Sequence, residues 1–367
     1  MPRISFVKLL SVLVLTLGAW LASASAAITY EVGTCKPHFP TYSSISAALA
    51  ATTPPDVVMI CPGTYTEQIE ITLPVTLEGV SVGDSAQVII EPPSGGLITN
   101  TSDDFGVPVA AQVWVNNVTG PVNITDITLD ATGNAGTNQE IIGVYYQNSS
   151  GTINRVATRN QQGNTLGTGI WVQGGAANPS VLIENSSIHD FDFAGIVAVT
   201  DAGSSQLTAT VKGNNVKVST TSSFTEGIVL RSGATTIVSN NFVSGETFGI
   251  ASELGAAGSI SGNTLIDNNQ DGIVAGADAV PVTSNKILNA VNNGIVLRTS
   301  AALIQGNSIL NTPFAINFDC QANANVHSNT ISDAGTALAF LPPGLTTLSN
   351  SYFNVSTIRS TSLCGPD

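Results

Sequence analysis

The C-terminal half of the chain repeats a short pattern of alternating apolar and polar residues. Each repeat opens with a Gly-Ile pair, and successive pairs are 22 or 23 residues apart, at Gly227, Gly249, Gly272 and Gly294. Alternation within the repeat indicates β-strand, so Ile228 and Leu230 should face inward and Arg231 outward. Three such runs per repeat predict a parallel β-helix, in which each coil packs only against its neighbours. An α-solenoid is excluded because the apolar residues show no 3.6-residue spacing.

An asparagine returns at nearly the same interval in these repeats. Asn tolerates the left-handed conformation of a sharp turn and can bond to the backbone within it. Stacked at one position, each side-chain amide can also donate to the asparagine of the next coil. We therefore expect a structural ladder rather than a binding feature. Its predicted members are Asn185, Asn214, Asn240, Asn263, Asn285, Asn307, Asn329 and Asn350.

The earlier part of the chain shares this plan, with longer loops. Gly143, Gly169 and Gly195 are 26 residues apart, and the step of 32 from Gly195 to Gly227 predicts an excursion within residues 217–226. Regular coils are expected over residues 143–360. The segment 41–51 has the pattern of a short amphipathic helix, which would cover the open end of the stack and protect its strand edges. Residues 27–367 are thus predicted to form one β-helix domain.

The first 26 residues have the three-part pattern of a secretory signal. Arg3 and Lys8 precede an apolar run over residues 9–21, and small residues follow over 22–26. The run is too short for a confident membrane span, and no later segment is long and apolar enough for one. We expect a secreted or periplasmic protein, with attachment to the cell surface left open and no membrane contact after signal cleavage.

Charge narrows the possible partners. The chain has 11 Lys and Arg against 25 Asp and Glu, a formal net charge of −14. Such a surface repels nucleic acid and anionic membranes, so neither is an expected partner. Disorder is disfavoured, because 43% of residues are hydrophobic and alternate with period 2.

The four cysteines lie near the two ends of the predicted stack. Coils are spaced by about 4.8 Å, so the first and last pairs should be far beyond disulfide reach of each other. We therefore predict the disulfides Cys35–Cys61 and Cys320–Cys364, each holding one end. A metal site is disfavoured because no Cys-x-x-Cys and no nearby histidine cluster is present.

The run SSISAALAATTPPDVVMICPGTYTEQIEITLPVTLEGVS, residues 43–81, resembles the N-terminal segment of the pectin lyase-like superfamily. The Gly-Ile and Asn-x-Ile units resemble the β-helix repeats of that superfamily. The resemblance implies an all-β, single-stranded right-handed parallel β-helix with a short N-terminal capping α-helix, and the crossover rule supports the same handedness. It leaves the activity open, because lyases, esterases, hydrolases, epimerases and non-enzymatic surface proteins share this fold.

The catalytic signatures of that superfamily are missing here. None of the three histidines, His38, His189 and His327, follows a glycine, as the Gly-His-Gly of polygalacturonases would require. The Arg-Ile-Lys of the same enzymes, the Asp-Pro-His-Asp of alginate epimerases and the Arg-x-Pro-x-x-Arg of pectate lyases are also absent. No known catalytic set transfers, so the sequence leaves open whether the protein is an enzyme.

The outward face of the strand after each Gly-Ile pair carries the candidate binding residues. Tyr145 and Trp171 occupy the same position on adjacent coils, where exposed rings could stack on sugars. Packing beneath a long loop is the alternative. Two residues further on, Arg231 and Glu253 fall on adjacent coils, either as a surface ion pair or as substrate contacts.

The turn SSIHDFDFAG carries the candidate acid–base residues His189, Asp190 and Asp192, and Glu226 is a further catalytic candidate. Paired carboxylates near sugar-stacking rings could hydrolyse a glycosidic bond. They could instead bind calcium or bond to backbone amides of a polar turn. No required cofactor and no other metal is predicted.

Two functions remain open from the sequence. The first is a secreted protein that binds a neutral or weakly acidic polysaccharide, or a cell-surface glycan, along the face of Tyr145 and Trp171. It could also cleave the glycan, as a lyase or a glycoside hydrolase. The second is a non-catalytic surface or matrix protein that uses the solenoid as a structural or adhesion scaffold.

Overall fold

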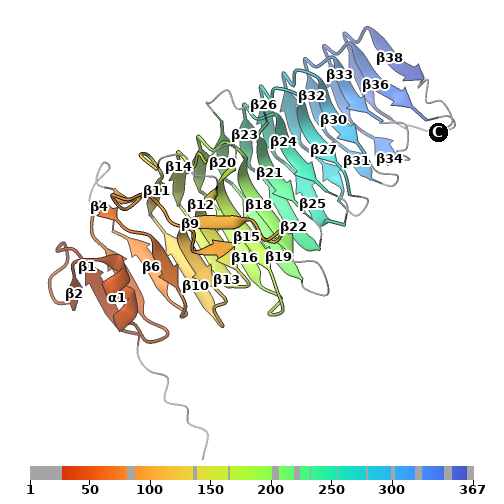
Figure 1. The fold of residues 1–367 in the computed structure, drawn as a ribbon. Coiled ribbons are helices and arrows are strands. Elements are labelled where there is room, and N and C mark those ends of the chain that lie inside the picture. Colours follow the sequence, from red (N-terminus) through yellow and green to blue (C-terminus); the bar gives the residue numbers. More distant parts are fainter. Residues whose placement is uncertain are drawn as a thin grey trace, which may run out of the picture.

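Three parallel β-sheets wind together into one stack of coils, as the repeat predicts (Figure 1). The computed structural model describes residues 27–80, 87–134, 139–163, 166–200, 206–218, 224–231, 233–253, 255–277, 280–298, 302–318, 325–342 and 349–361. Each coil contributes one strand to sheet C, then one to sheet A and one to sheet B. The fold class is confirmed: an all-β parallel β-helix with one short helix near its N-terminal end.

Sheet A runs along the stack through β2 (Thr41–Tyr42), β1 (Thr29–Val32), β3 (Val57–Ile60), β6 (Thr76–Gly79), β10 (Pro121–Thr125), β13 (Ser150–Asn154), β16 (Ser180–Glu184), β19 (Leu207–Lys212), β22 (Ala234–Ser239), β25 (Ala257–Ser261), β28 (Val282–Thr283), β31 (Leu303–Gln305) and β34 (Asn325–His327). Sheet B runs through β4 (Gly63–Thr66), β7 (Val88–Glu91), β11 (Thr128–Asp130), β14 (Ala157–Arg159), β17 (Ser187–His189), β20 (Asn215–Lys217), β23 (Phe242–Ser244), β26 (Thr264–Ile266), β29 (Lys286–Leu288), β32 (Ser308–Leu310), β35 (Thr330–Ser332) and β37 (Ser351–Phe353).

Sheet C runs through β5 (Ile69–Ile71), β9 (Pro108–Asn116), β12 (Glu140–Gln147), β15 (Gly167–Gly174), β18 (Ala194–Thr200), β21 (Glu226–Leu230), β24 (Phe248–Ser252), β27 (Asp271–Ala275), β30 (Asn293–Leu297), β33 (Phe314–Asn317), β36 (Thr336–Leu341) and β38 (Thr357–Thr361). One short strand is an exception to the parallel pairing: β8 (Thr101–Ser102) pairs antiparallel with β9. It belongs to a segment, residues 97–107, that we call the arm.

The core is the interior of the coils. The isoleucine after each glycine points inward and stacks on its counterparts, because adjacent strands pair in register, with Ile228 opposite Ile250 and Ile250 opposite Ile273. All three are buried. The prediction from the sequence that Ile228 and Leu230 face inward is therefore confirmed, since both belong to the interior cluster.

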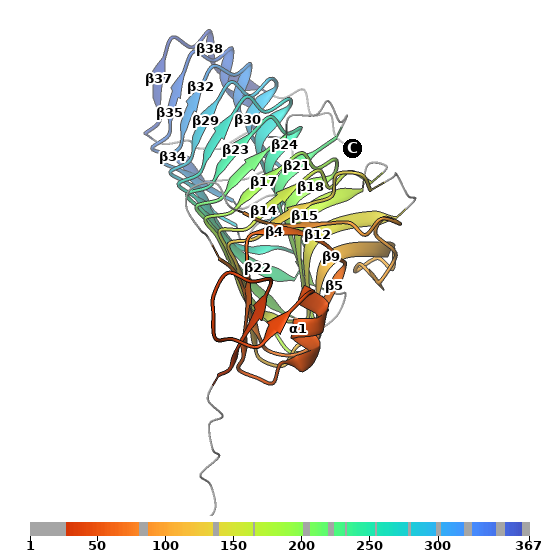
Figure 2. The same cartoon turned by 90° about the vertical axis from the view of Figure 1, so that its left-hand side faces the viewer.

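The helix α1 (Ile45–Ala51) lies at the N-terminal end of the stack (Figure 2). It is shorter than the predicted 41–51, because Thr41 and Tyr42 pair with β1 as strand β2. Ser44 then caps the helix, and its Oγ accepts a bond from the Ala47 N–H. Ile45 and Ala48 face the core, so the helix covers the end of the first coil.

A buried asparagine ladder runs between sheets A and B. Asn263 is typical: its N–H and its Nδ2 both donate to Asn285 Oδ1, at 2.9 and 3.0 Å, and Nδ2 also donates to the Val238 carbonyl. These bonds satisfy polar groups that water cannot reach. The ladder runs through Asn214, Asn241, Asn263, Asn285, Asn307, Asn329 and Asn350.

Two predicted ladder positions were wrong by one residue. Asn240 and Asn185 precede the ladder, and each adopts the left-handed conformation, with φ of 55° and 53°. The ladder place itself is held by Asn241 in one coil and by Ser186 in the other, whose N–H donates to Asn214 Oδ1. The left-handed turn residue and the ladder residue are thus neighbours, and the sequence argument had assigned both roles to one position.

The predicted Cys35–Cys61 disulfide is present, with the two Cα atoms 5.6 Å apart. It holds the loop after β1 to the end of β3. Cys320 and Cys364, the signal pattern in residues 1–26 and part of the predicted excursion, residues 219–223, lie outside the described residues. Among the helices that the structure describes, none has the length and hydrophobicity to cross a bilayer.

Candidate functional site

The outer face of sheet C is divided into a covered half and an open half. The covered half lies over β9, β12, β15 and β18, where the arm and an apolar cluster pack on the outside of the sheet. The open half lies over β21, β24, β27 and β30. The predicted binding face is this face, but the predicted stacking residues lie in the half that is covered.

Tyr145 and Trp171 are buried, which overturns their prediction as exposed sugar-stacking rings. They are paired on adjacent strands as expected, and their exposed fractions are 0% and 1%. The Tyr145 hydroxyl donates to the Ser102 carbonyl in the arm at 3.2 Å and also contacts Gln173 Oε1. Both rings pack with outward-facing residues of four strands, so they fill the space between sheet and arm.

Arg231 lies at the boundary between the two halves. Its guanidinium carbon is 5.3 Å from the ring centre of Trp171, 5.5 Å from that of Phe105 in the arm and 5.6 Å from that of Phe193. Its Nε lies 3.4 Å from Glu253 Oε1. The predicted pairing with Glu253 is present, and the three rings hold the cation against the covered half.

The turn with His189, Asp190 and Asp192 serves the backbone around it. Asp192 accepts bonds from the N–H groups of Gly163, at 3.0 Å, and Gly167 on the adjacent coil. Asp190 has a left-handed φ of 58° and lies 2.6 Å from His189 Nδ1. None of the three lines the open groove described next.

Metal ligands converge at one place within the described part of the chain. Glu31, Cys35 and Cys61 lie close together there. Since the two cysteines form the disulfide, their sulfur atoms are not thiolate ligands.

A groove of about 590 Å³ lies over the open half. Its floor consists of the small residues Ala251 on β24, Val274 on β27 and Gly276, which directly follows β27. A side chain at Gly276 would meet the Ser252 carbonyl oxygen at 2.3 Å, so only glycine allows this close approach of the two coils. Two features leave this surface uncovered. The outward-facing side chains are small, and the arm reaches only as far as Arg231.

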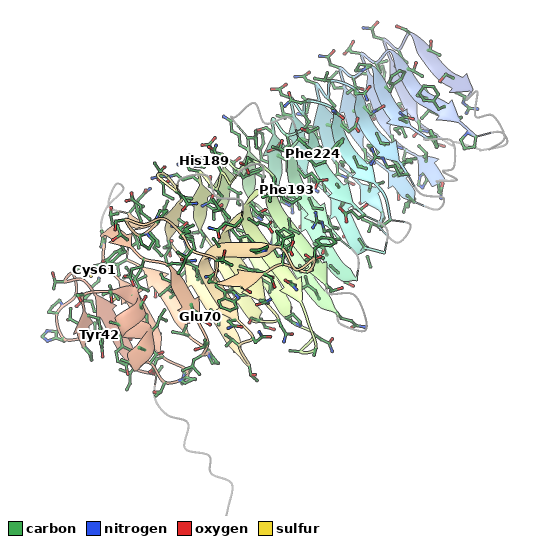
Figure 3. All side chains as sticks on the ribbon, in the orientation of Figure 1. Tyr42, Cys61, Glu70, His189, Phe193 and Phe224 are labelled. Atoms are coloured by element: carbon green, nitrogen blue, oxygen red, sulfur yellow. A yellow bond between two sulfur atoms is a disulfide. The ribbon has the colours of Figure 1, made fainter. Side chains whose placement is uncertain are left out.

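One wall of the groove is aromatic. Phe224, which is 46% exposed, packs edge-on against Phe248, with the ring centres 5.4 Å apart and an interplanar angle of 78°. The guanidinium carbon of Arg298 lies 6.0 Å from the ring centre of Phe248. Figure 3 labels Phe224 beside this groove and Phe193 in the covered half. Sequence reasoning missed Phe248, although it directly precedes Gly249 as Glu226 precedes Gly227.

Two carboxyl groups line the same groove. Glu226 is 8% exposed, and its side-chain carboxyl group makes no hydrogen bond or ion pair with the described residues. Burial, and then the charge of Glu253, raise its pKa to about 7, while Arg231 and Arg298 act in the opposite direction. Glu253 is half-exposed and paired with Arg231. Of the predicted site residues, Glu226, Glu253 and Arg231 therefore lie together.

Comparisons with known proteins support the fold. Residues 195–358 match the family model described as "Right handed beta helix region". No curated protein matches the sequence.

Three solved structures are similar over most of the chain. The GH136 lacto-N-biosidase from Eubacterium ramulus has a TM-score of 0.63 at 12% identity, covering 90% of this chain and 68% of that one. The A-module of the mannuronan C-5 epimerase AlgE4 of Azotobacter vinelandii has 0.52 at 17%, covering 88% and 92%. The surface adhesin PfbA of Streptococcus pneumoniae has 0.54 at 14%, covering 86% of each chain.

Sequence identities of 12–17% are too low to transfer an activity, so these structural similarities show the fold alone. They confirm the resemblance to pectin lyase-like proteins at that level. The chain is a right-handed parallel β-helix, distantly similar in structure to carbohydrate-active β-helix enzymes and to a β-helix adhesin.

Proposed function

We propose that this protein binds a glycan chain across the outer face of sheet C, in the groove over β21, β24 and β27. The observation that carries the proposal is the composition of this groove. A floor of small apolar residues lies beside an exposed aromatic edge, and charged side chains line the other positions. Glycan sites need this combination, because a sugar has apolar faces that stack on rings and hydroxyl groups that bond to polar side chains.

The neighbours in structure are compatible with a glycan partner. Two of the three carry the names of carbohydrate enzymes, a biosidase and a mannuronan epimerase, and the third is named as a surface adhesin. The groove also lies on the face that the sequence predicted for binding, three coils further along than Tyr145.

The proposed location is outside the cytoplasm. The Cys35–Cys61 disulfide is consistent with an oxidising compartment. The signal pattern in residues 1–26 supports the same location, as a secreted or periplasmic protein.

A non-catalytic scaffold is the second candidate. The continuous asparagine ladder and the missing catalytic signatures favour it, since both suit a stiff spacer that displays a surface. The two candidates differ in one respect: a scaffold has no need of an open groove with a glycan specificity.

Binding is tested by affinity electrophoresis and calorimetry against plant, algal and bacterial polysaccharides. Phe224→Ala should weaken binding at least about 10-fold, as for loss of a stacking anchor. Phe353→Ala is the matched control, because Phe353 is 60% exposed but lies in sheet B. Equal binding by both variants, or no binding of any polysaccharide by the wild type, would contradict the proposal.

A further inference from the structure

We infer that the groove hydrolyses a neutral glycan, with Glu226 as the general acid and Glu253 as the carboxylate that activates water. The inference rests on the proposed glycan binding and adds a reaction and a substrate class to it. In the reaction, the oxygen of a water molecule bonds to the anomeric carbon as the bond to the leaving oxygen breaks. Glu226 gives its proton to that oxygen, Glu253 takes a proton from the water, and solvent returns the proton to Glu226.

The placement of the two side chains comes from the strands. Glu226 begins β21 and pairs in register with Phe248 of the adjacent strand β24. Glu253 directly follows the end of β24, five residues beyond Phe248. The two carboxyl groups therefore approach the groove from opposite ends of the strands, with Ala251 and Val274 between them on the floor. The charge of Glu253 acts on Glu226, so the two groups face the same space, and a sugar on this floor would lie between an acid and a base.

Glu226 is suited to be the acid because it lines the groove and its carboxyl group has no partner among the described residues. The residue is only 8% exposed, and a largely buried carboxyl group without a hydrogen bond or ion pair to the described residues has no structural use in that part of the chain. Its pKa of about 7 keeps it protonated in mildly acidic solution. The charged groups that face it are Glu253, Arg231 and Arg298. A general acid works best when its pKa is near the working pH.

Glu253 is suited to be the base because it is solvated and its charge is balanced. It is 47% exposed, and Arg231 lies 3.4 Å away. The three rings around Arg231 fix that cation. Arg231 is thus a positioning residue that holds Glu253 at the edge of the groove.

Other buried acids of the chain show what distinguishes Glu226. Glu140 is equally buried, but it accepts a bond from Thr168 and lies in the covered half. Glu246 is fully buried and does not line the groove over the open half. Burial alone is therefore a common property of acids in this β-helix. Glu226 combines it with a place in an open groove and a second carboxyl group beside it.

The overall charge of the chain indicates a neutral substrate. Its net charge is −14, so a polyuronate would meet long-range repulsion and a neutral glycan would not. Within the groove, Glu226 is protonated in mildly acidic solution and Glu253 is paired with Arg231, so a neutral glycan would meet little uncompensated charge there.

The test measures reducing ends released from glucan, xylan, mannan and galactan, with alginate and polygalacturonate as charged comparators. Wild-type protein should cleave at least one neutral glycan, faster at pH 5 to 6 than at pH 8, and neither polyuronate. Glu226→Gln and Glu253→Gln should each lower kcat by at least 100-fold and keep binding of that glycan within about 3-fold. Glu70→Gln is the control, because Glu70 is an exposed carboxylate on β5 of the same sheet, labelled in Figure 3.

The outcomes separate this inference from the proposed function. If the wild type binds no glycan at all, the binding proposal fails. If it binds only the polyuronates, binding stands and the neutral substrate is wrong. If it binds a glycan that it never cleaves, binding stands and hydrolysis is wrong. If Glu226→Gln folds with an unchanged circular dichroism spectrum and cleaves as fast as the wild type, Glu226 is not the acid.

Discussion

The strands of sheet C pair in the same parallel register along the whole stack, but one half of the outer face is covered and the other half is open. In the covered half, the second residues after Gly143 and Gly169 are Tyr145 and Trp171. The arm bonds to Tyr145, and its Phe105 contacts the same Arg231 as Trp171. Val229, further along the same row, still belongs to the buried apolar cluster outside the sheet, whereas Ala251 and Val274 beyond it lie under an open groove. Large side chains fill the space beneath a covering segment, and small side chains leave that space to solvent. An aromatic residue at an outward position of a β-helix therefore indicates a cover at least as readily as it indicates a ligand.

The largest expected effect belongs to the covered half. Trp171→Ala should lower the free energy of unfolding by about 3–5 kcal/mol, because it leaves a cavity between β15 and the arm. Phe224→Ala in the open half should change it by less than about 1 kcal/mol, since Phe224 is 46% exposed. Denaturant midpoints of the two variants test this comparison. A Trp171→Ala protein of unchanged stability that no longer binds glycan would restore the sequence-based view of this ring.

The second prediction compares the buried acids of the two halves. Burial, and then the charge of Asp103, raise the pKa of Glu140 to about 8, and burial and Glu253 raise that of Glu226 to about 7. Both pKa values lie above the value of about 4.3 for glutamate in the unfolded chain. The stability that each protonated carboxyl group contributes is therefore complete below about pH 4.3. It is lost as the pH rises through about 7 for Glu226 and about 8 for Glu140. Between pH 4 and pH 9 the free energy of unfolding should fall by about 4 kcal/mol through Glu226 and by about 5 kcal/mol through Glu140.

Unfolding free energies measured across that pH range test this prediction. Glu140→Gln and Glu226→Gln should each flatten the fall of stability with pH, and Glu70→Gln should leave it unchanged. A bound glycan should shift the titration of Glu226 and leave that of Glu140 alone. Curves parallel to the wild type in both variants would show that neither carboxyl group is protonated in the folded protein at neutral pH.

The third prediction applies the contrast of buried and open positions to two asparagines of one coil. Asn285 is buried, accepts from the N–H and Nδ2 of Asn263, and donates to Asn307, so Asn285→Ala should cost about 1–3 kcal/mol. Asn289 makes similar side-chain bonds at the exposed surface. Asn289→Gly keeps its left-handed backbone and should cost less than about 0.5 kcal/mol. Equal losses in the two variants would mean that burial does not decide the value of an amide ladder.

The smallest expected effect concerns the boundary residue. Arg231→Met should cost about 1 kcal/mol of stability through its lost ring contacts, whereas Arg298→Met, with one ring contact, should cost less. Both substitutions should raise the pKa of Glu226, because both cations lower it. Carbon-13 NMR titration of the glutamate carboxyl groups measures the shift. A fall of this pKa in either variant would contradict the charge arrangement described for the groove.

Turn-level features show where sequence reasoning reached its limit. The interval of the asparagines located the ladder and most of its members, since that interval is the length of a coil. In the Asn240–Asn241 pair, however, two adjacent asparagines fit the interval almost equally well. Only the structure shows that Asn240 makes the left-handed turn and that Asn241 enters the ladder. Both roles suit the same residue type, so composition cannot separate them.

The sequence by itself determined the architecture of this protein. Strand alternation and the coil period are local properties, so they predicted the parallel β-helix, the inward row of Ile228 and the adjacent placement of Arg231 and Glu253. The Cys35–Cys61 pair followed from the order of the coils. Tertiary structure alone decided which part of the outer face is open. The arm that buries Trp171 lies more than 60 residues before it in the chain. The burial of Glu226 likewise depends on packing between coils, and such contacts leave no periodic trace in the sequence.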